Sequence, residues 1–205
     1  MKIYDISQEV FECSTYHGDP SPKREVIFSM KDGYLYNLSA FYMCTHNGTH
    51  IDAPAHFLKN GATIDQLPLE KMVGTAYVCY HNGLVTGEIA DRFMREARNE
   101  CGDDIRIILI RGRAAISFEA AQVFAYDGVQ LLGCEFQSIA AGNLVIPVHR
   151  LLLDKGVLIL EGLRMDFVNP GKYFLCATPL NLGNCEASPC RAILIDFEDR
   201  RRRFI

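Results

Sequence analysis

Four side chains of the kinds that bind metal ions stand close together near residue 50. His46, His50, Asp52 and His56 fall within eleven residues. Imidazole and carboxylate groups suit Zn, Mn and Fe ions, and the two oxygens of one carboxylate can bridge two ions. A single histidine on a loop is usually solvated, but a solvated loop needs no such concentration of ligand types. The segment therefore predicts a metal site.

The spacing of these residues indicates an extended segment rather than a helix. The glycine and the proline inside the segment oppose a continuous helix. In an extended chain His50 and Asp52 project to the same side, and a turn at Gly48 lets His46 join them. We therefore expect three ligands on a loop or strand end directly after a strand at residues 34–44, where rigid secondary structure holds them.

A metal site with these ligands is suited to hydrolysis, because bound ions acidify water and polarise carbonyl oxygens. Other hydrolytic nucleophiles find no support: the sequence has no Gly-x-Ser-x-Gly motif, and no cysteine stands out from its apolar surroundings as an activated thiol. Its eight cysteines lie mostly in apolar runs, so we expect mainly buried thiols rather than disulfides. It also has no Gly-x-Gly-x-x-Gly or phosphate-loop pattern, which argues against a nucleotide cofactor.

The elements that must position these residues are mostly strands. Runs rich in β-branched and aromatic residues predict strands at 26–29, 34–44, 75–80, 105–111, 129–132, 157–160, 173–179 and 192–197. Helical spacing predicts helices at 87–99, 117–126 and 143–155, the second starting at Ser117 and stopping at Gly128. The two types alternate through the second half, which favours an α/β domain with a mixed β-sheet flanked by helices.

Length and composition are those of an ordinary globular protein. The chain has 205 residues, 49% of them hydrophobic and 22% charged. We find neither a linker nor a shift of composition, so we expect residues 1–205 to form a single domain. A chain of this length buries enough apolar surface to fold without a metal. The metal is therefore expected to serve chemistry.

The charge balance argues against nucleic acid and membrane partners. Lys and Arg number 21 against 25 Asp and Glu, a net charge of -4, so no basic field would gather phosphates. The run Arg200–Arg203 is expected to be a solvated tail or a subunit contact. No apolar stretch approaches the roughly 20 residues of a membrane span, and the first residues lack a secretory signal. We expect a cytoplasmic protein with a small-molecule substrate.

The segment around residue 50 resembles the His-x-Gly-Thr-His-x-Asp-x-Pro-x-His motif of the metal-dependent cyclase-like hydrolases. The best-described members of that family are bacterial kynurenine formamidases and isatin hydrolases. The match is complete over His46, Gly48, Thr49, His50, Asp52, Pro54 and His56. Residues 16–20, His149 with 156–163, and 179–183 with 188–192 extend it through nearly the whole chain. The resemblance implies a swivelling β/α/β fold.

The resemblance also implies two divalent ions, with Zn the first expectation and Mn the second. It implies that His46, His50 and Asp52 hold one ion, with Glu161 contributing. Asp52, His149 and Glu161 would hold the other. Without the resemblance, His149 and Glu161 are equally compatible with charged residues at the ends of a helix and a buried strand.

Two further roles follow from the resemblance. His56 would act as the general acid and base, a role that suits an ordinary pKa near ~6.5; its alternatives are a third ligand or a structural partner. Tyr16 would lie against the substrate ring, and a plain apolar cover of the site is the alternative. Family members are commonly dimers or tetramers, so a homodimer or homotetramer is expected, and the aromatic-rich residues 34–42 could supply an interface.

The activity implied is that of an arylformamidase, which cleaves the amide C–N bond of N-formylkynurenine to give formate and kynurenine in tryptophan breakdown. The alternatives are hydrolysis of a cyclic amide or lactone, as in isatin hydrolases, and a metal-binding or ligand-sensing module without catalysis. The chain departs from the family at His17, where Pro is frequent, and at Glu135, where Asp is common. It also has no Trp. We expect these departures to alter the pocket or its surroundings.

Overall fold

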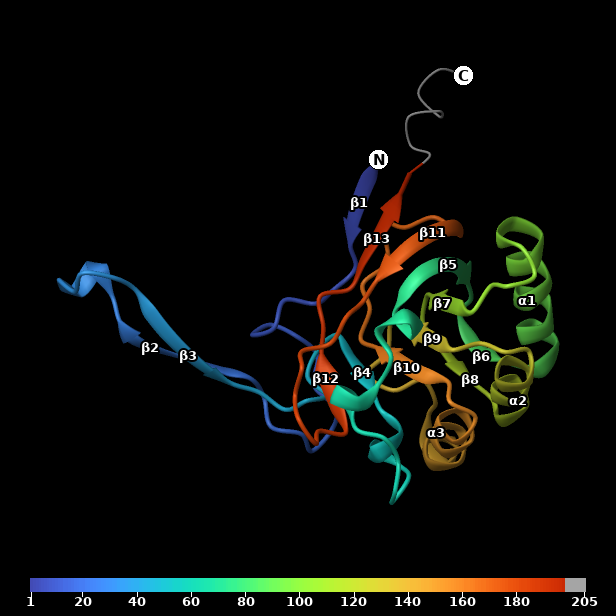
Figure 1. Cartoon of the computed structure of the whole chain (residues 1–205), viewed down its shortest axis with the longest axis horizontal. Coiled ribbons are helices and arrows are strands. Elements are labelled where there is room, and N and C mark those ends of the chain that lie inside the picture. Colours follow the sequence, from blue (N-terminus) through green and yellow to red (C-terminus); the bar gives the residue numbers. More distant parts are fainter. Residues whose placement is uncertain (198–205) are drawn as a thin grey trace.

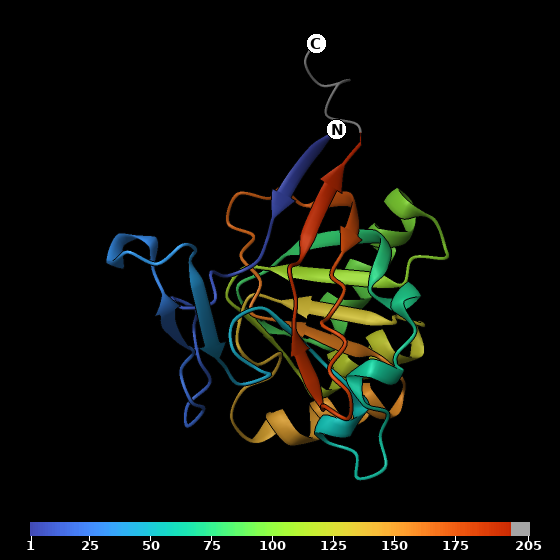
Figure 2. The same ribbon diagram turned by 60° about the vertical axis from the view of Figure 1, so that its left-hand side comes forward.

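A nine-stranded mixed β-sheet organises the chain, and the computed structural model describes residues 1–197 (Figure 1). The Arg200–Arg203 run lies outside the described residues. In spatial order the strands are β1 (Lys2–Asp5), β13 (Ile193–Asp196), β11 (Gly171–Cys176), β5 (Val73–Tyr80), β7 (Ile107–Arg111), β9 (Leu131–Cys134), β10 (Leu158–Glu161), β4 (His50–Asp52) and β12 (Ala187–Pro189). The strands from β5 to β10 run parallel to one another, and the pairs on either side are antiparallel. Figure 2 shows the curl of this sheet.

The three helices cover one face of the sheet. They are α1 (Gly87–Cys101), α2 (Phe118–Tyr126) and α3 (Val145–Asp154), and they lie together beside β7, β9 and β10 (Figure 1). Thr86 and Ser117 begin α1 and α2, because their hydroxyls accept hydrogen bonds from the backbone N–H groups of Ile89 and Ala120. The predicted helices, including the start at Ser117, are confirmed.

The core has two parts, one on each face of the sheet. Along β7, Ile108 and Ile110 pack with the helices, whereas Ile107 and Leu109 pack on the other face. Successive side chains of a strand point to opposite faces, so an unbroken apolar run is what a strand buried on both faces requires. The predicted mixed α/β architecture is confirmed by this arrangement.

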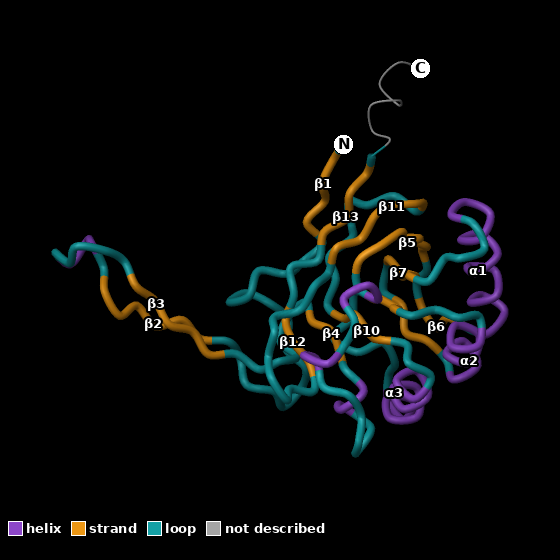
Figure 3. Tube along the Cα trace, viewed as in Figure 1, coloured by secondary structure: helices purple, strands orange, loops and turns teal. Residues whose placement is uncertain are grey.

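A two-stranded arm extends away from the main sheet (Figure 3). It consists of β2 (Lys23–Phe28) and β3 (Leu38–Tyr42), which pair only with each other. Every residue of β3 is exposed. The expectation of a strand over 34–44 that supports the site is therefore wrong in extent and in role, since a β-rich pattern predicts extended backbone but not what that backbone packs against.

Several short strands have no counterpart among the sequence predictions. They are β1 and β12 in the main sheet, and β6 (Gly83–Val85) with β8 (Ala114–Ile116) in a separate parallel pair. All eight cysteines are free, but only Cys79 and Cys134 are buried and the other six are half-buried. The expectation of mainly buried thiols is thus wrong, whereas all eight cysteines are free, as expected.

Among residues 1–197 no helix combines the length and apolarity that a bilayer crossing requires.

Candidate metal centre

The predicted ligands meet at one end of β4 and β10. His50 and Asp52 lie on β4, Glu161 ends β10 and His149 lies on α3. His46 stands in the loop that enters β4. His50, Asp52, His149 and Glu161 are buried, the first two by at least 99%. The extended conformation expected for residues 50–52 is confirmed.

Two groups of ligand atoms share the Asp52 carboxylate. In the first group, His46 Nδ1 lies 3.0 Å and His50 Nε2 3.5 Å from Asp52 Oδ1. In the second, His149 Nε2 lies 3.3 Å from Glu161 Oε1 and 3.8 Å from Asp52 Oδ2. The ligand atoms of each group lie within 4.8 Å of one another, a spacing that could hold a metal ion.

Glu161 also connects the two groups. Its Oε2 lies 3.4 Å from His50 Nε2, while its Oε1 accepts a hydrogen bond of 2.7 Å from the backbone N–H of Ile139. The Glu161 carboxylate is therefore fixed in place by the backbone and is shared between a histidine of each group.

The donor set fits a cation. Both Asp52 oxygens are buried without a hydrogen-bond partner among the described residues. His50 Nδ1 lies 2.9 Å from the Gly48 carbonyl and His149 Nδ1 lies 2.6 Å from the Val145 carbonyl. With Nδ1 donating to a carbonyl, the Nε2 lone pair of each ring faces carboxylate oxygens. Such an arrangement requires a proton or a metal ion between these atoms.

The electrostatics of the cluster also favour positive charge. Burial alone would lower the pKa of His50, but the hydrogen bond and charge of Glu161 and the charge of Asp52 outweigh it and raise the pKa to about 9. For Asp52, burial raises the pKa, yet His46 and His50 outweigh this effect and lower it to about 2. The Asp52 carboxylate thus remains ionised and stabilises a cation at the centre.

His56 stands beside the ligand groups without belonging to either. Its ring centroid lies 4.2 Å from that of His46 and 6.2 Å from that of His149. Burial lowers the pKa of His56 below 6.5, more strongly than the charge of Asp52 raises it. The ring is therefore neutral at pH 7 and can take up and release a proton near the ligand groups.

A cavity of about 330 Å³ opens onto the ligand groups. Its lining residues are Tyr16, Asp19, His46, His50, His56, Phe57, Gln137, Ser138, Val145, His149 and Glu161. Tyr16 lies in this lining with 44% of its surface exposed. This position suits both readings of Tyr16, a contact to the substrate ring and a cover of the site.

Sequence reasoning missed several residues of this site. The Phe57 ring stands 4.7 Å from that of His149 and 4.3 Å from that of His56, and its place directly after His56 was a usable signal. Glu186 has an oxygen 3.3 Å from His46 Nε2, and no local pattern marks it. Gln137 and Ser138, two and three residues after Glu135, also line the cavity.

Glu135 does not line the cavity, so of the two expected sites for its effect, the pocket and its surroundings, this departure falls in the surroundings. Its two oxygens accept hydrogen bonds from the backbone N–H groups of Gly112 and Met165. The longer side chain thus joins the turn after β7 to the segment after β10. His17 is exposed and is also absent from the lining of the cavity.

Comparison with known proteins identifies the family of the chain. The Cyclase family, described as Putative cyclase, matches residues 4–141. A kynurenine formamidase of Salinibacter ruber is 33% identical over 217 residues, covering 97% of this chain and 100% of that protein. The chain belongs to the Cyclase family. The resemblance expected from the residue 46–56 motif is confirmed.

Solved structures of the Cyclase family fold share the architecture. A predicted metal-dependent hydrolase from Bacillus stearothermophilus superposes with a TM-score of 0.78 at 28% identity, covering 94% of this chain and 97% of that one. Isatin hydrolase A from Labrenzia aggregata superposes with a TM-score of 0.80 at 21% identity, covering 94% of this chain and 93% of that one. This likeness shows the fold alone. These relatives confirm the expected enzyme of the hydrolase type and the single mixed-sheet fold.

Proposed function

We propose that the protein is an arylformamidase that hydrolyses N-formylkynurenine to formate and kynurenine. The observation that carries this proposal is the pair of ligand groups sharing Asp52, with His56 beside them in one cavity. Support for the substrate comes from the relatives named kynurenine formamidase, which cover nearly the whole chain.

We propose two divalent ions at the centre, Zn first and Mn second. One would be held by His46, His50 and Asp52 and the other by Asp52, His149 and Glu161. Ions bound there would polarise the formyl carbonyl and acidify water.

The chain's own residues supply the remaining steps. As a water oxygen attacks the formyl carbon, His56 takes the proton that this water loses and releases it to the departing aryl nitrogen, so that the C–N bond breaks to give formate and the free amine. Phe57, packed against the rings of His56 and His149, limits their rotation and keeps water from that side. Tyr16 at the cavity lining is placed to contact the aryl ring of the substrate.

The deciding experiment compares protein stripped by a chelator with protein reloaded with Zn or Mn, using N-formylkynurenine. Fast hydrolysis that disappears on stripping and returns on reloading supports the proposal. A protein that holds the ion and leaves the formamide intact overturns it. Isatin and simple lactones would then be tested as the alternative, and failure of all of these would favour a binding or sensing module.

The role of His56 is tested separately with His56→Ala. The expected result is a fall in kcat of about 10²–10⁴-fold with the metal content unchanged. A turnover equal to that of the unaltered protein removes His56 from the catalytic group, and a loss of metal would make it a ligand.

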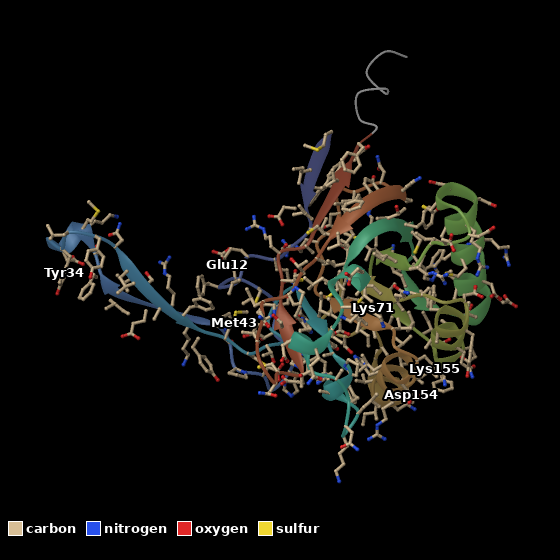
Figure 4. All side chains as sticks on the ribbon, in the orientation of Figure 1. Glu12, Tyr34, Met43, Lys71, Asp154 and Lys155 are labelled. Atoms are coloured by element: carbon tan, nitrogen blue, oxygen red, sulfur yellow. The ribbon has the colours of Figure 1, made fainter. Side chains whose placement is uncertain are left out.

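We also propose that two copies of the chain associate through the β2–β3 arm. Leu35 is 93% exposed, and Phe41 and Tyr42 are each 61% exposed, although an isolated two-stranded hairpin is marginally stable in water. Tyr34 lies at the outer end of the arm and Met43 at its base (Figure 4). A hollow at that base is lined by Phe41, Tyr42, Met43, Thr45, Leu180, Leu182 and Pro189. In a two-fold dimer, the outer end of each arm can cover the hollow of the other copy.

Light scattering on the purified protein tests this association. The expected result is a dimer that Leu35→Asp converts to monomer, whereas Leu84→Asp, at a position 52% exposed on β6, leaves it intact. A monomer at micromolar concentration contradicts the proposal.

The cytoplasmic location expected from the sequence stays a prediction.

A further inference from the structure

Gln137 and Ser138 are polar residues of the cavity that the proposed mechanism leaves without a task. Both follow β9 and line the cavity beside His149 and Glu161. Gln137 Oε1 and Nε2 and Ser138 Oγ are buried, and none of them has a hydrogen-bond partner among the described residues. Buried polar groups are almost always paired, so these unpaired groups at the wall of a functional cavity are available to hydrogen-bond a bound molecule.

The backbone around these two residues is firmly held. On one side, the N–H groups of Gly162 and Leu163 donate to the carbonyls of Phe136 and Cys134, at 2.8 and 3.1 Å. On the other side, the N–H of Ile139 donates to Glu161. Because both flanks are fixed to the end of β10, Gln137 and Ser138 are presented to the cavity in a set position.

Gly162 leaves room for the Gln137 carboxamide. An added Cβ at Gly162 would lie 2.5 Å from Gln137 Nε2 and 2.2 Å from the Gly48 carbonyl oxygen. The backbone at Gly162 has φ of +69°, which glycine adopts without strain. The carboxamide thus packs directly on the residue that follows the ligand Glu161.

The residue types that line the cavity restrict which substrate group Gln137 and Ser138 can bind. No Lys or Arg is present in the lining formed by the described residues, whereas Asp19 and Glu161 are. Gln137 and Ser138 are themselves neutral, so they offer hydrogen bonds rather than charge to a substrate group. A carboxamide N–H and a hydroxyl O–H can both donate to one carbonyl oxygen. The reacting formyl group is already served by the ligand groups and His56.

We infer that Gln137 and Ser138 determine specificity by binding a ketone oxygen carried on the aryl ring next to the formamide. This inference rests on the proposed arylformamidase activity, whose substrate carries such a ketone. The pair contacts the part of the substrate that does not react, so its loss acts on binding of one substrate class rather than on turnover of all aryl formamides.

The experiment compares two substrates in Gln137→Leu and Ser138→Ala. N-formylkynurenine carries the ring ketone and formanilide lacks it. The expected result is a rise in KM of about 5- to 10-fold for N-formylkynurenine, with kcat and KM for formanilide and the metal content unchanged. Gln122→Leu is the matched control, because Gln122 is exposed on α2. An equal loss on both substrates, or no change on either, overturns the inference.

A binding measurement separates this inference from the proposed function. Calorimetry with 2-aminoacetophenone and aniline, which differ by the ring ketone, needs no hydrolysis. If wild-type protein binds the ketone more tightly and Gln137→Leu abolishes that difference, the specificity pair stands even where formamide hydrolysis fails. Equal affinities for the two compounds in the wild-type protein would disprove it.

Discussion

Glu186 and Asp52 flank the His46 ring, one at each ring nitrogen. The Glu186 Oε1 lies 3.3 Å from His46 Nε2, while Asp52 lies at Nδ1. Glu186 itself is oriented by the Thr45 hydroxyl, which donates to the same oxygen at 2.6 Å. A carboxylate on the second nitrogen of a ligating histidine fixes the ring and raises its basicity. Glu186 therefore acts as a positioning residue for His46.

Glu186→Gln is expected to weaken Zn binding by about 10- to 100-fold, because the amide keeps the shape of Glu186 but loses its charge. Calorimetric titration of the stripped protein with Zn measures the effect. Glu70→Gln is the control, since Glu70 is exposed and does not line the cavity. An affinity equal to that of wild-type protein would show that Glu186 does not support His46.

Asp52→Asn is expected to remove both ligand groups at once, since each contains Asp52. Metal content after dialysis should fall to background and hydrolysis should fall with it. Far-UV circular dichroism checks that the fold persists. Asp154→Asn, at the exposed end of α3, serves as the control. Retention of one ion per chain would show that Asp52 is not shared.

Gly162→Ala is expected to destabilise the fold by about 2–4 kcal/mol. The new methyl group would meet the Gly48 carbonyl, and the left-handed backbone would be strained. At Gly183 nothing lies within 4 Å of an added Cβ, so Gly183→Ala should leave stability nearly unchanged. Urea denaturation compares the two. Similar midpoints would refute the packing described for Gly162.

Phe124→Ala is expected to cost about 3–5 kcal/mol, because Phe124 on α2 is fully buried among the helices and the sheet. Tyr126 on the same helix is 70% exposed, and Tyr126→Ala should change the free energy of unfolding by less than about 0.5 kcal/mol. Thermal melting with both variants tests the helix-covered core. Equal losses would contradict it.

Tyr16→Ala distinguishes the two roles that remain for this side chain. If Tyr16 contacts the aryl ring, KM for N-formylkynurenine should rise by about 3- to 10-fold, since aromatic pairs contribute about 0.5–1.5 kcal/mol. Steady-state kinetics on the metal-loaded protein gives the answer. Unchanged KM and kcat would leave Tyr16 as no more than a cover.

The local pattern of residue types was sufficient to predict the helices and strands whose apolar residues follow a clear period. The apolar run of β7 and the amphipathic α1 follow directly from residue type, and Ser117 begins α2 as its hydroxyl chemistry requires. The strands of the arm were predicted as extended segments, but their projection from the body was not, because β-propensity does not report what a strand packs against. The extended conformation of residues 50–52 was also predicted, whereas the place of β4 between β10 and β12 depends on tertiary pairing.

The same distinction applies to the site. His46, His50 and Asp52 were readable because they are neighbours in sequence. Glu186 reaches His46 only through the return of the chain along β12, which pairs with β4. Contacts of that kind depend on tertiary structure, and no spacing rule reports them.

The sharing of Asp52 between two ligand groups links the lifetime of the protein to the supply of ions. His50 and His149 meet only when the fold is complete, so the unfolded chain has no comparable site, and every bound ion favours the native state. An ion present at a hundred times its dissociation constant adds about 2.7 kcal/mol to the free energy of unfolding. In a cell short of that ion, the chain would unfold more often and be degraded faster, so enzyme abundance would fall together with activity.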